Sequence, residues 1–328
     1  MKKGFRILKF KKDKPIFEVK DISKSYDGRP ILKKLSLKVF PGECVGILGP
    51  NGCGKTTLFS MCIGEENVEN GKIFLNGKSI ETIPIHLRSN EGIGYLPQQR
   101  SVFNMSVYDN VLGIAQISVK GFENQKAITE KLLDEFNLQH LRTINASVLS
   151  GGEIRRLMMA RVMIKKPKIV LLDEPLAALD PLIIQDIQKY ILKIQSSGTA
   201  ILVTDHNVKN LFDITDRSYV LGEQTVIAEG TSRELLKSTK AISEKVSSVK
   251  NVLESEDVAS TIACLKKLGV KIKKVNFNNY IIFGNGLGSL KAKKNSKLNF
   301  GNSGTLARLL IGILSTTPGL ELKVLGDH

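Results

Sequence analysis

Residues 44–57 read Cys-Val-Gly-Ile-Leu-Gly-Pro-Asn-Gly-Cys-Gly-Lys-Thr-Thr, and this stretch decides the fold. The apolar run 44–48 predicts a buried strand, and a helix is predicted to begin near Lys55. The residues between them fit the pattern G-x-x-x-x-G-K-[ST], which arises by chance in about 1% of chains this long. Glycines let backbone N–H groups converge on phosphate oxygens, and the helix that follows adds the positive end of its dipole. The stretch therefore predicts a phosphate-binding loop.

This loop supplies most of the predicted nucleotide contacts. Lys55 is predicted to reach the β- and γ-phosphates, and the Thr56 hydroxyl to ligate Mg²⁺. The loop residues assigned to nucleotide binding are Gly49, Pro50, Asn51, Gly52, Cys53, Gly54, Lys55, Thr56 and Thr57.

A second predicted strand, 168–172, ends in the acidic pair Asp173-Glu174. Ligands of parallel sheets bind at the carboxyl ends of the strands, so this pair is predicted to lie at the binding edge. Asp173 suits the shell of a Mg²⁺ ion, and Glu174 suits the activation of an attacking water. An acidic pair after a strand is more often a solvated loop, but its place about 120 residues after the phosphate loop favours the functional interpretation.

The rest of the first 240 residues predicts an α/β fold around this edge. Apolar runs alternate with helical patterns, which is typical of a parallel sheet covered on both faces. Residues 16–40 predict an antiparallel hairpin with its turn at Asp27-Gly28, and 106–163 are predicted to be mainly helical. Further strands are predicted at 72–75, 93–96, 200–204, 216–221 and 224–229, and a helix at 181–195.

The composition limits which classes of protein remain possible. The 328 residues carry a formal charge of +16 and are 42% apolar, so the chain can build real cores and favours an anionic partner. No apolar run approaches the length of a membrane span, and the basic segment 1–15 lacks the apolar stretch of a signal peptide. Four cysteines without metal spacing predict a reduced, cytoplasmic protein.

The segment Leu149-Ser-Gly-Gly-Glu153 resembles the signature sequence of the ATP-binding-cassette ATPases. In that family, the signature of one subunit covers the ATP held by another. The resemblance implies a homodimer with two ATP molecules between its subunits. It assigns γ-phosphate contacts to Ser150, Gly151, Gly152 and Glu153.

The family resemblance spans about residues 16–240 and assigns four more positions. Tyr26 would stack on adenine, although a tyrosine in a hairpin could also be a packing residue. Gln98 would contact Mg²⁺ and water, and Asp180 would lie in the loop that crosses the dimer interface. His206 would contact the γ-phosphate and act beside Glu174, although a single histidine is more often structural.

Finer resemblance points to the LptB family, the ATPases of lipopolysaccharide export. It is carried by Gly94-Tyr-Leu-Pro-Gln98, Ser106-Val-Tyr-Asp-Asn110 and Thr204-Asp-His-Asn-Val208. This implies permease partners similar to LptF and LptG, and a location on the cytoplasmic face of the inner membrane. Residues 99–105 would dock the permease through Phe103, although their apolar members could equally be core. The ATPases of branched-chain amino-acid importers are the alternative within the class.

Residues 249–328 resemble 5-enolpyruvylshikimate-3-phosphate (EPSP) synthase, a carboxyvinyl transferase. The turn Phe300-Gly-Asn-Ser-Gly-Thr305 carries the resemblance and assigns a vestigial phosphoenolpyruvate site to Asn302, Gly304, Thr305 and Arg308. Because only about 80 residues of a much longer enzyme are present, we expect an inactive segment. Such a piece should leave apolar residues such as Leu309, Leu310 and Ile311 partly uncovered.

The predicted organisation is thus a basic extension over 1–15, a P-loop cassette over 16–245, and a truncated synthase-like segment over 246–328. The cassette should combine a parallel core sheet, an antiparallel β subdomain and a helical subdomain. The favoured function is ATP hydrolysis that drives lipopolysaccharide export. Amino-acid import and 3-phosphoshikimate 1-carboxyvinyltransferase activity are the alternatives, and no direct nucleic-acid partner is expected because two cassettes or long insertions are missing.

Overall fold

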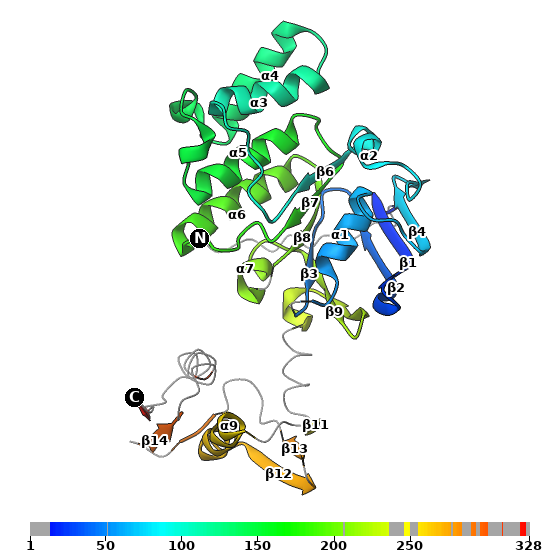
Figure 1. The fold of residues 1–328 in the computed structure, drawn as a ribbon. Coiled ribbons are helices and arrows are strands. Elements are labelled where there is room, and N and C mark those ends of the chain that lie inside the picture. Colours follow the sequence, from blue (N-terminus) through cyan, green and yellow to red (C-terminus); the bar gives the residue numbers. More distant parts are fainter. Residues whose placement is uncertain are drawn as a thin grey trace. The chain divides into compact units, whose positions relative to one another are not determined.

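In the computed structural model, the strand that precedes the phosphate-binding loop, β3 (Cys44–Leu48), lies inside a six-stranded sheet (Figure 1). The strand order is β10-β9-β3-β8-β7-β6. The other members are β6 (Ile93–Leu96), β7 (Ile169–Asp173), β8 (Ala200–Thr204), β9 (Arg217–Gly222) and β10 (Thr225–Gly230). Strands β9 to β6 run parallel, and β10 joins the edge antiparallel. Every residue of β3, β7 and β8 is buried, as the apolar runs predict.

The structure describes residues 14–50, 52–205, 207–235, 246–249, 255–276, 278–283, 290–292, 296–300, 310 and 322–325. The chain divides into two compact units, Met1–Ser232 and Arg233–His328. The predicted boundary between residues 245 and 246 stays a prediction, as does the extension over 1–15.

A second, antiparallel sheet has the order β2-β1-β4-β5. Its strands are β1 (Phe17–Tyr26), β2 (Arg29–Val39), β4 (Asn70–Leu75) and β5 (Lys78–Ser79). Asp27 and Gly28 join β1 to β2 with φ angles of 49° and 74°, which is the backbone that a two-residue hairpin turn requires and that this dipeptide favours. The sheet buries Phe17, Val19 and Leu35 in one apolar cluster with Leu58 and Phe59 of the helix after the phosphate loop.

Helices complete the first unit. The longer ones are α1 (Lys55–Ile63), α2 (Ile85–Glu91), α3 (Val107–Ser118), α4 (Phe122–Glu135), α5 (Gly151–Met163) and α6 (Pro181–Ser196), and the shorter ones are η1 (Gln139–Leu141), η2 (Ala146–Val148) and α7 (Val208–Phe212). Figure 1 shows α3 and α4 on the side of the unit away from β1, β2 and β4. The predicted parallel core, antiparallel subdomain and helical subdomain are all confirmed.

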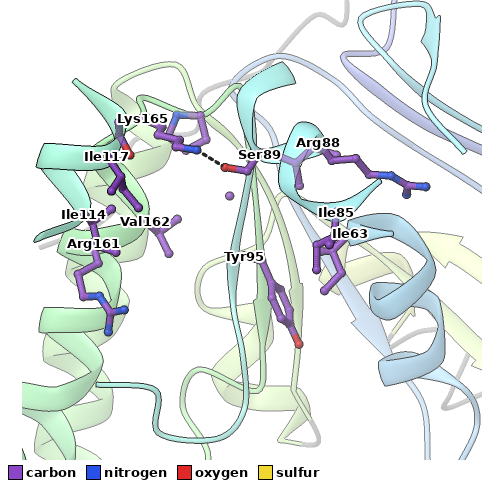
Figure 2. A pocket seen from close by; sticks show the side chains of 14 residues that line it. Ile63, Ile85, Arg88, Ser89, Tyr95, Ile114, Ile117, Arg161, Val162 and Lys165 are labelled. Atoms are coloured by element: carbon purple, nitrogen blue, oxygen red, sulfur yellow. Dashed lines mark hydrogen bonds between the residues drawn. The ribbon is translucent and has the colours of Figure 1, made fainter. Parts of the chain in front are cut away.

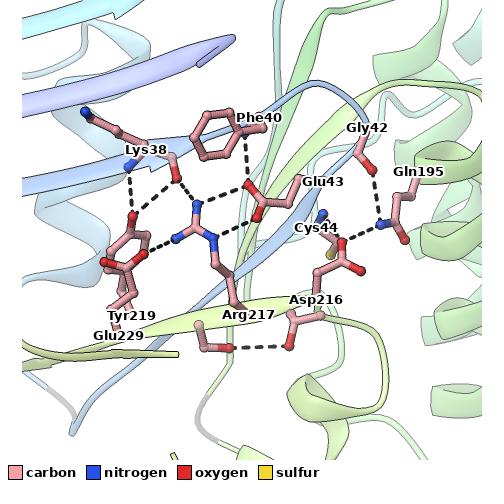
Figure 3. A network of polar contacts seen from close by, with 12 residues as sticks. Lys38, Phe40, Gly42, Glu43, Cys44, Gln195, Asp216, Arg217, Tyr219 and Glu229 are labelled. Atoms are coloured by element: carbon pink, nitrogen blue, oxygen red, sulfur yellow. Dashed lines mark hydrogen bonds and ion pairs between the residues drawn. The ribbon is translucent and has the colours of Figure 1, made fainter. Parts of the chain in front are cut away.

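A polar network joins the two sheets of this unit (Figure 3). The Arg217 guanidinium at the start of β9 donates to both carboxylate oxygens of Glu43 at 2.7 and 3.1 Å and to Glu229 at 2.7 Å. It also donates to the Lys38 carbonyl of β2 at 2.6 Å. The side chains of Arg217 and Glu43 are only 11% and 3% exposed, so each charge depends on the other for its stability.

The second unit has elements and a small core of its own. They are β11 (Val246–Val249), α9 (Glu256–Lys267), β12 (Lys271–Asn276), β13 (Asn279–Phe283), β14 (Ser296–Asn299) and β15 (Leu322–Leu325). One sheet is antiparallel, in the order β11-β13-β12, and β14 pairs with β15 in parallel. The expectation that Leu310 is partly uncovered was wrong, because it is 3% exposed and packs with Cys264, Leu268, Leu298 and Phe300. Leu309 and Ile311 lie outside the described residues.

Candidate nucleotide-binding site

The phosphate-binding loop leaves β3 and enters α1 through left-handed glycines. Gly52 and Gly54 have φ angles of 78° and 97°, a conformation that costs glycine little. A Cβ on Gly54 would lie 2.7 Å from the Leu32 side chain, so the position has no room for another residue. The buried Lys55 ammonium donates to the carbonyls of Gly49 and Pro50 at 2.8 and 3.0 Å. The cation therefore lies over the loop, where an anion would meet it.

A cavity of about 500 Å³ opens beside this loop. Its size is that of a small-molecule site. It is lined by Tyr26, Ile31, Gly52, Gly54, Lys55, Thr56, Thr57, Gln98 and Glu174. Tyr26 stands at the end of β1 with 40% of its surface exposed, which favours the stacking interpretation over the packing one. The structure thus brings eight sequence-predicted residues to one cavity.

The acidic pair lies where β7 ends beside β8. The Thr204 hydroxyl donates to a carboxylate oxygen of Asp173 at 2.7 Å and accepts from the Glu174 N–H at 3.0 Å. Burial raises the pKa of the Asp173 carboxyl, and the hydrogen bond from Thr204 opposes that shift. Thr204 was missed by the sequence analysis, because only the pairing of Asp173 with Thr204 across two strands reveals the contact.

Gln98 connects the acidic pair to the loop that follows β6. Its side-chain amide donates to Glu174 Oε2 at 2.8 Å. The Arg155 guanidinium, from α5, donates to the carbonyls of Pro97 and Gln98 at 3.0 and 2.8 Å and so fixes the loop. Arg155 was also missed. A charged residue on the buried side of a helix would have been the signal for it.

The signature segment begins α5. Ser150 and Glu153 form a capping box, in which the Glu153 carboxylate accepts from the Ser150 N–H at 2.8 Å and from its hydroxyl at 2.7 Å. The hydrogen bond from Ser150 lowers the pKa of Glu153. Gly151 and Gly152 bring α5 close to α6 and the loop before it, since their Cβ atoms would lie 3.2 Å from Leu179 and 2.7 Å from Ile183.

The signature and the 500 Å³ cavity are separate in one copy of the chain. Among the described residues that line the cavity, none comes from 149–153 or from Asp180, which stands at the start of α6. The predicted contacts of these residues with ATP thus need a second copy. Asn51, His206 and the vestigial set Asn302, Gly304, Thr305 and Arg308 lie outside the described residues.

The side chains near the loop fit Mg²⁺, which prefers oxygen ligands and completes its shell with substrate phosphates and water. Thr56, Gln98 and Asp173 would supply a hydroxyl, an amide oxygen and a carboxylate. In the described part of the chain, no group of three or more His, Cys, Asp or Glu side chains could hold a metal by itself. A Mg²⁺ ion here would therefore arrive with its nucleotide.

The parallel sheet, its phosphate loop and the separate signature define an ATP-binding cassette. A family model described as ABC transporter matches residues 32–177. The lipopolysaccharide export system ATP-binding protein LptB of Haemophilus influenzae is 40% identical over 67% of this chain and 92% of its own length. The protein of the same name from Escherichia coli K12 is 42% identical over 66% of this chain and 91% of its own length.

Solved structures agree with this class. The cbiO1 protein of Clostridium perfringens aligns with a TM-score of 0.64 and 29% identity, over 70% of this chain and 94% of its own. An ATP-binding cassette solved in its ADP conformation aligns with a TM-score of 0.62 and 27% sequence identity. The alignment covers 69% of this chain and 95% of that one. The chain belongs to the ABC transporter ATP-binding family. It is an ATPase that couples ATP hydrolysis to transport.

A second family model, EPSP synthase (3-phosphoshikimate 1-carboxyvinyltransferase), matches residues 219–328. The resemblance of the C-terminal segment is thereby confirmed. The match begins inside β9, so it also includes the last two strands of the cassette sheet.

Alkylation of Cys53 is expected to abolish ATP hydrolysis, and bound ATP to protect the thiol. The other three cysteines are buried, whereas Cys53 is half-buried with its Sγ 3.9 Å from Lys55 Nζ. The Cys53 side chain packs against the apolar core beneath the phosphate loop, so an alkyl group there would distort the loop that holds the phosphates. Phosphate release is measured after stoichiometric labelling, with a Cys53→Ser variant as control. Full activity of the labelled wild type contradicts the prediction.

A Thr204→Val variant should lower the free energy of unfolding by about 2 kcal/mol, because the buried Asp173 carboxylate loses its hydroxyl donor. The Glu174 N–H loses its acceptor at the same time. Urea unfolding of wild type and variant measures the change. Thr204→Ser keeps the hydroxyl and serves as the matched control. Wild-type stability of Thr204→Val would show that the two hydrogen bonds of the hydroxyl do not contribute.

Proposed function

We propose that the protein drives lipopolysaccharide export from the inner membrane as a homodimer with two ATP molecules between its subunits. The observation that carries this proposal is the 40–42% identity to LptB proteins over more than nine tenths of their length. Docking to the permease would place the dimer on the cytoplasmic face of that membrane. Among the residues that the structure describes, no helix has both the length and the apolar composition needed to cross a bilayer.

The proposed chemistry follows from the cavity. Tyr26 stacks on adenine, the loop N–H groups and Lys55 hold the phosphates, and the partner copy closes the site with its Ser150 to Glu153 segment. Glu174, assisted by His206, orients and deprotonates the water that attacks the γ-phosphate in line. Mg²⁺, held by Thr56, Asp173 and Gln98, would neutralise phosphate charge when bound. Loss of the γ-phosphate weakens the closed dimer, and Asp180 lies in the loop that would sense it.

A groove beside α2 fits the proposed permease partner (Figure 2). It encloses about 320 Å³ and is lined mainly by isoleucines and cations. These include Ile63, Ile85, Ile114, Ile117, Arg88, Arg161 and Lys165. The Arg88 guanidinium is buried and donates to backbone carbonyls, so the isoleucines and the Lys165 ammonium remain to meet a partner. Such a lining suits the apolar face of an amphipathic cytoplasmic helix. We propose that LptF- and LptG-like permease subunits supply this helix.

Phe103 stands near this groove and is proposed as a permease contact. Its side chain is 47% exposed, so the alternative that it belongs to the core does not hold. The Arg161 guanidinium lies 4.5 Å from its ring centre and also donates to the Ser101 carbonyl. Arg161 therefore holds both ends of the short segment that presents Phe103.

The export proposal is tested with the permease genes of the same organism. The chain is co-purified with its LptF- and LptG-like subunits and reconstituted into vesicles that contain lipopolysaccharide. We expect ATP-dependent release of lipopolysaccharide, and none from a Glu174→Gln complex. Failure to co-purify, together with binding to the permease of a branched-chain amino-acid importer, would favour the import alternative.

The C-terminal segment is proposed to lack transferase activity, despite its match to the EPSP synthase model. The residues assigned to phosphoenolpyruvate stand on a segment of about 80 residues, whereas that chemistry needs two facing domains. Incubation of the full chain with shikimate-3-phosphate and phosphoenolpyruvate, without ATP, should release no phosphate. Release above that of a buffer control would establish the carboxyvinyl transferase as a second activity.

A further inference from the structure

We propose that Arg100 is a further nucleotide-contacting residue, whose guanidinium binds the γ-phosphate of the ATP held by the partner copy. The inference rests on the proposed homodimer and adds to its site a side chain that the family signature does not include.

The position of Arg100 links two parts of the site. Two residues earlier in the loop, Gln98 binds Glu174 of the same chain. Arg100 instead reaches toward the start of α5, where its Nη2 atom lies 3.7 Å from the point that a Cβ on Gly151 would occupy. This separation is that of an ordinary van der Waals contact. The guanidinium therefore lies beside the N–H groups with which the signature would bind phosphate.

The charge of Arg100 is not neutralised there. It is exposed, and within the described ranges it forms no ion pair with a carboxylate. The nearest acidic side chain of the signature, Glu153, is engaged with the N–H and hydroxyl of Ser150. Arg100 also acts on the buried Arg155, whose pKa is lowered by burial first and by Arg100 second. A cation of this kind attracts an anion to the start of the helix.

The anion must come from another molecule of the chain. The 500 Å³ cavity beside the phosphate loop has neither Arg100 nor a signature residue among its described lining. In the proposed dimer, the signature faces the γ-phosphate on the partner's loop, and Arg100 accompanies it. Its planar guanidinium can then donate two hydrogen bonds to the same phosphate group.

The first test uses the full chain with Glu174→Gln, in which hydrolysis is blocked. Adding Arg100→Ala should raise the ATP concentration needed for dimerisation about 10- to 100-fold, as expected for a lost charge-assisted hydrogen bond. Arg100→Lys should need an ATP concentration between those of the other two proteins, because lysine keeps the positive charge but loses the planar, two-pronged donor of the guanidinium. Lys120→Ala removes an exposed cation from the end of α3 and serves as the control.

A second test asks on which chain Arg100 acts. Mixed dimers with two affinity tags, all carrying Glu174→Gln, are purified and titrated with a fluorescent ATP analogue. In the first mixture, a Lys55→Ala chain pairs with an Arg100→Ala chain, so the working loop faces an intact Arg100. In the second, a chain with both substitutions pairs with one that carries neither, so the working loop faces Ala at that position. We expect tight binding in the first mixture and weak binding in the second.

The outcomes separate this inference from the proposed function. If Glu174→Gln alone fails to dimerise with ATP, the homodimer proposal fails. If it dimerises and Arg100→Ala changes nothing, only the role of Arg100 is overturned. Weak binding in the first mixture and tight binding in the second would show that Arg100 acts on the ATP of its own chain, which also overturns the inference.

Discussion

A Glu174→Gln variant is expected to hydrolyse ATP about 10²- to 10⁴-fold more slowly than the wild type, the usual effect of losing a general base. ATP binding should persist, because Lys55 and the loop glycines are untouched. The Gln98 amide can still donate to the amide oxygen at position 174, so the local geometry should survive. Steady-state phosphate release gives the rate, and gel filtration with ATP shows the trapped dimer.

Glu223→Gln is the matched control for this change, since Glu223 is exposed in the turn between β9 and β10. It should turn over ATP at the wild-type rate. Wild-type turnover by the Glu174→Gln variant would remove Glu174 from the role of general base. Loss of ATP binding in that variant would instead assign it to nucleotide affinity.

Replacement of Arg217 by Met should lower the free energy of unfolding of the cassette by about 3–5 kcal/mol. The substitution keeps the volume but leaves the Glu43 carboxylate, 3% exposed, without its partner. It also removes the donor to the Lys38 carbonyl, which joins the two sheets, and the donor to Glu229 of the neighbouring strand β10 (Figure 3). Urea unfolding followed by far-UV circular dichroism measures the loss.

Two further variants make this prediction specific. Arg142→Met breaks the exposed pair of Arg142 with Glu130 and should cost less than about 1 kcal/mol. Adding Glu43→Leu to Arg217→Met should recover part of the loss, since no unpaired charge then remains buried. Equal losses from Arg142→Met and Arg217→Met would contradict the importance of burial.

The fold was predictable where local chemistry determines structure. The runs at β3 and β8 are buried at every position and apolar except for Thr204, because both faces of the sheet are covered, and their predicted bounds agree with the structure. The turn at Asp27-Gly28 follows from the backbone angles that this dipeptide tolerates. The phosphate loop and acidic pair were likewise visible, because each motif is contiguous in the chain.

The contacts that support the site could not be predicted in the same way. Thr204, Arg155 and Arg100 meet their partners across tens of residues, so no local pattern reveals them. The expectation for Leu310 was wrong for a related reason. A fragment of a larger fold was expected to leave this residue partly uncovered, whereas Leu268 at the end of α9 and Leu298 of β14 cover it.

The hydrogen bond between Gln98 and Glu174 has a consequence for a transporter at rest. ATP is always present in a living cell, so a cassette whose water-activating carboxylate were permanently available would consume it without moving cargo. Here that carboxylate is held by an amide of the same loop that presents Phe103 near the groove. We therefore expect ATP turnover without cargo to stay slow until this loop shifts.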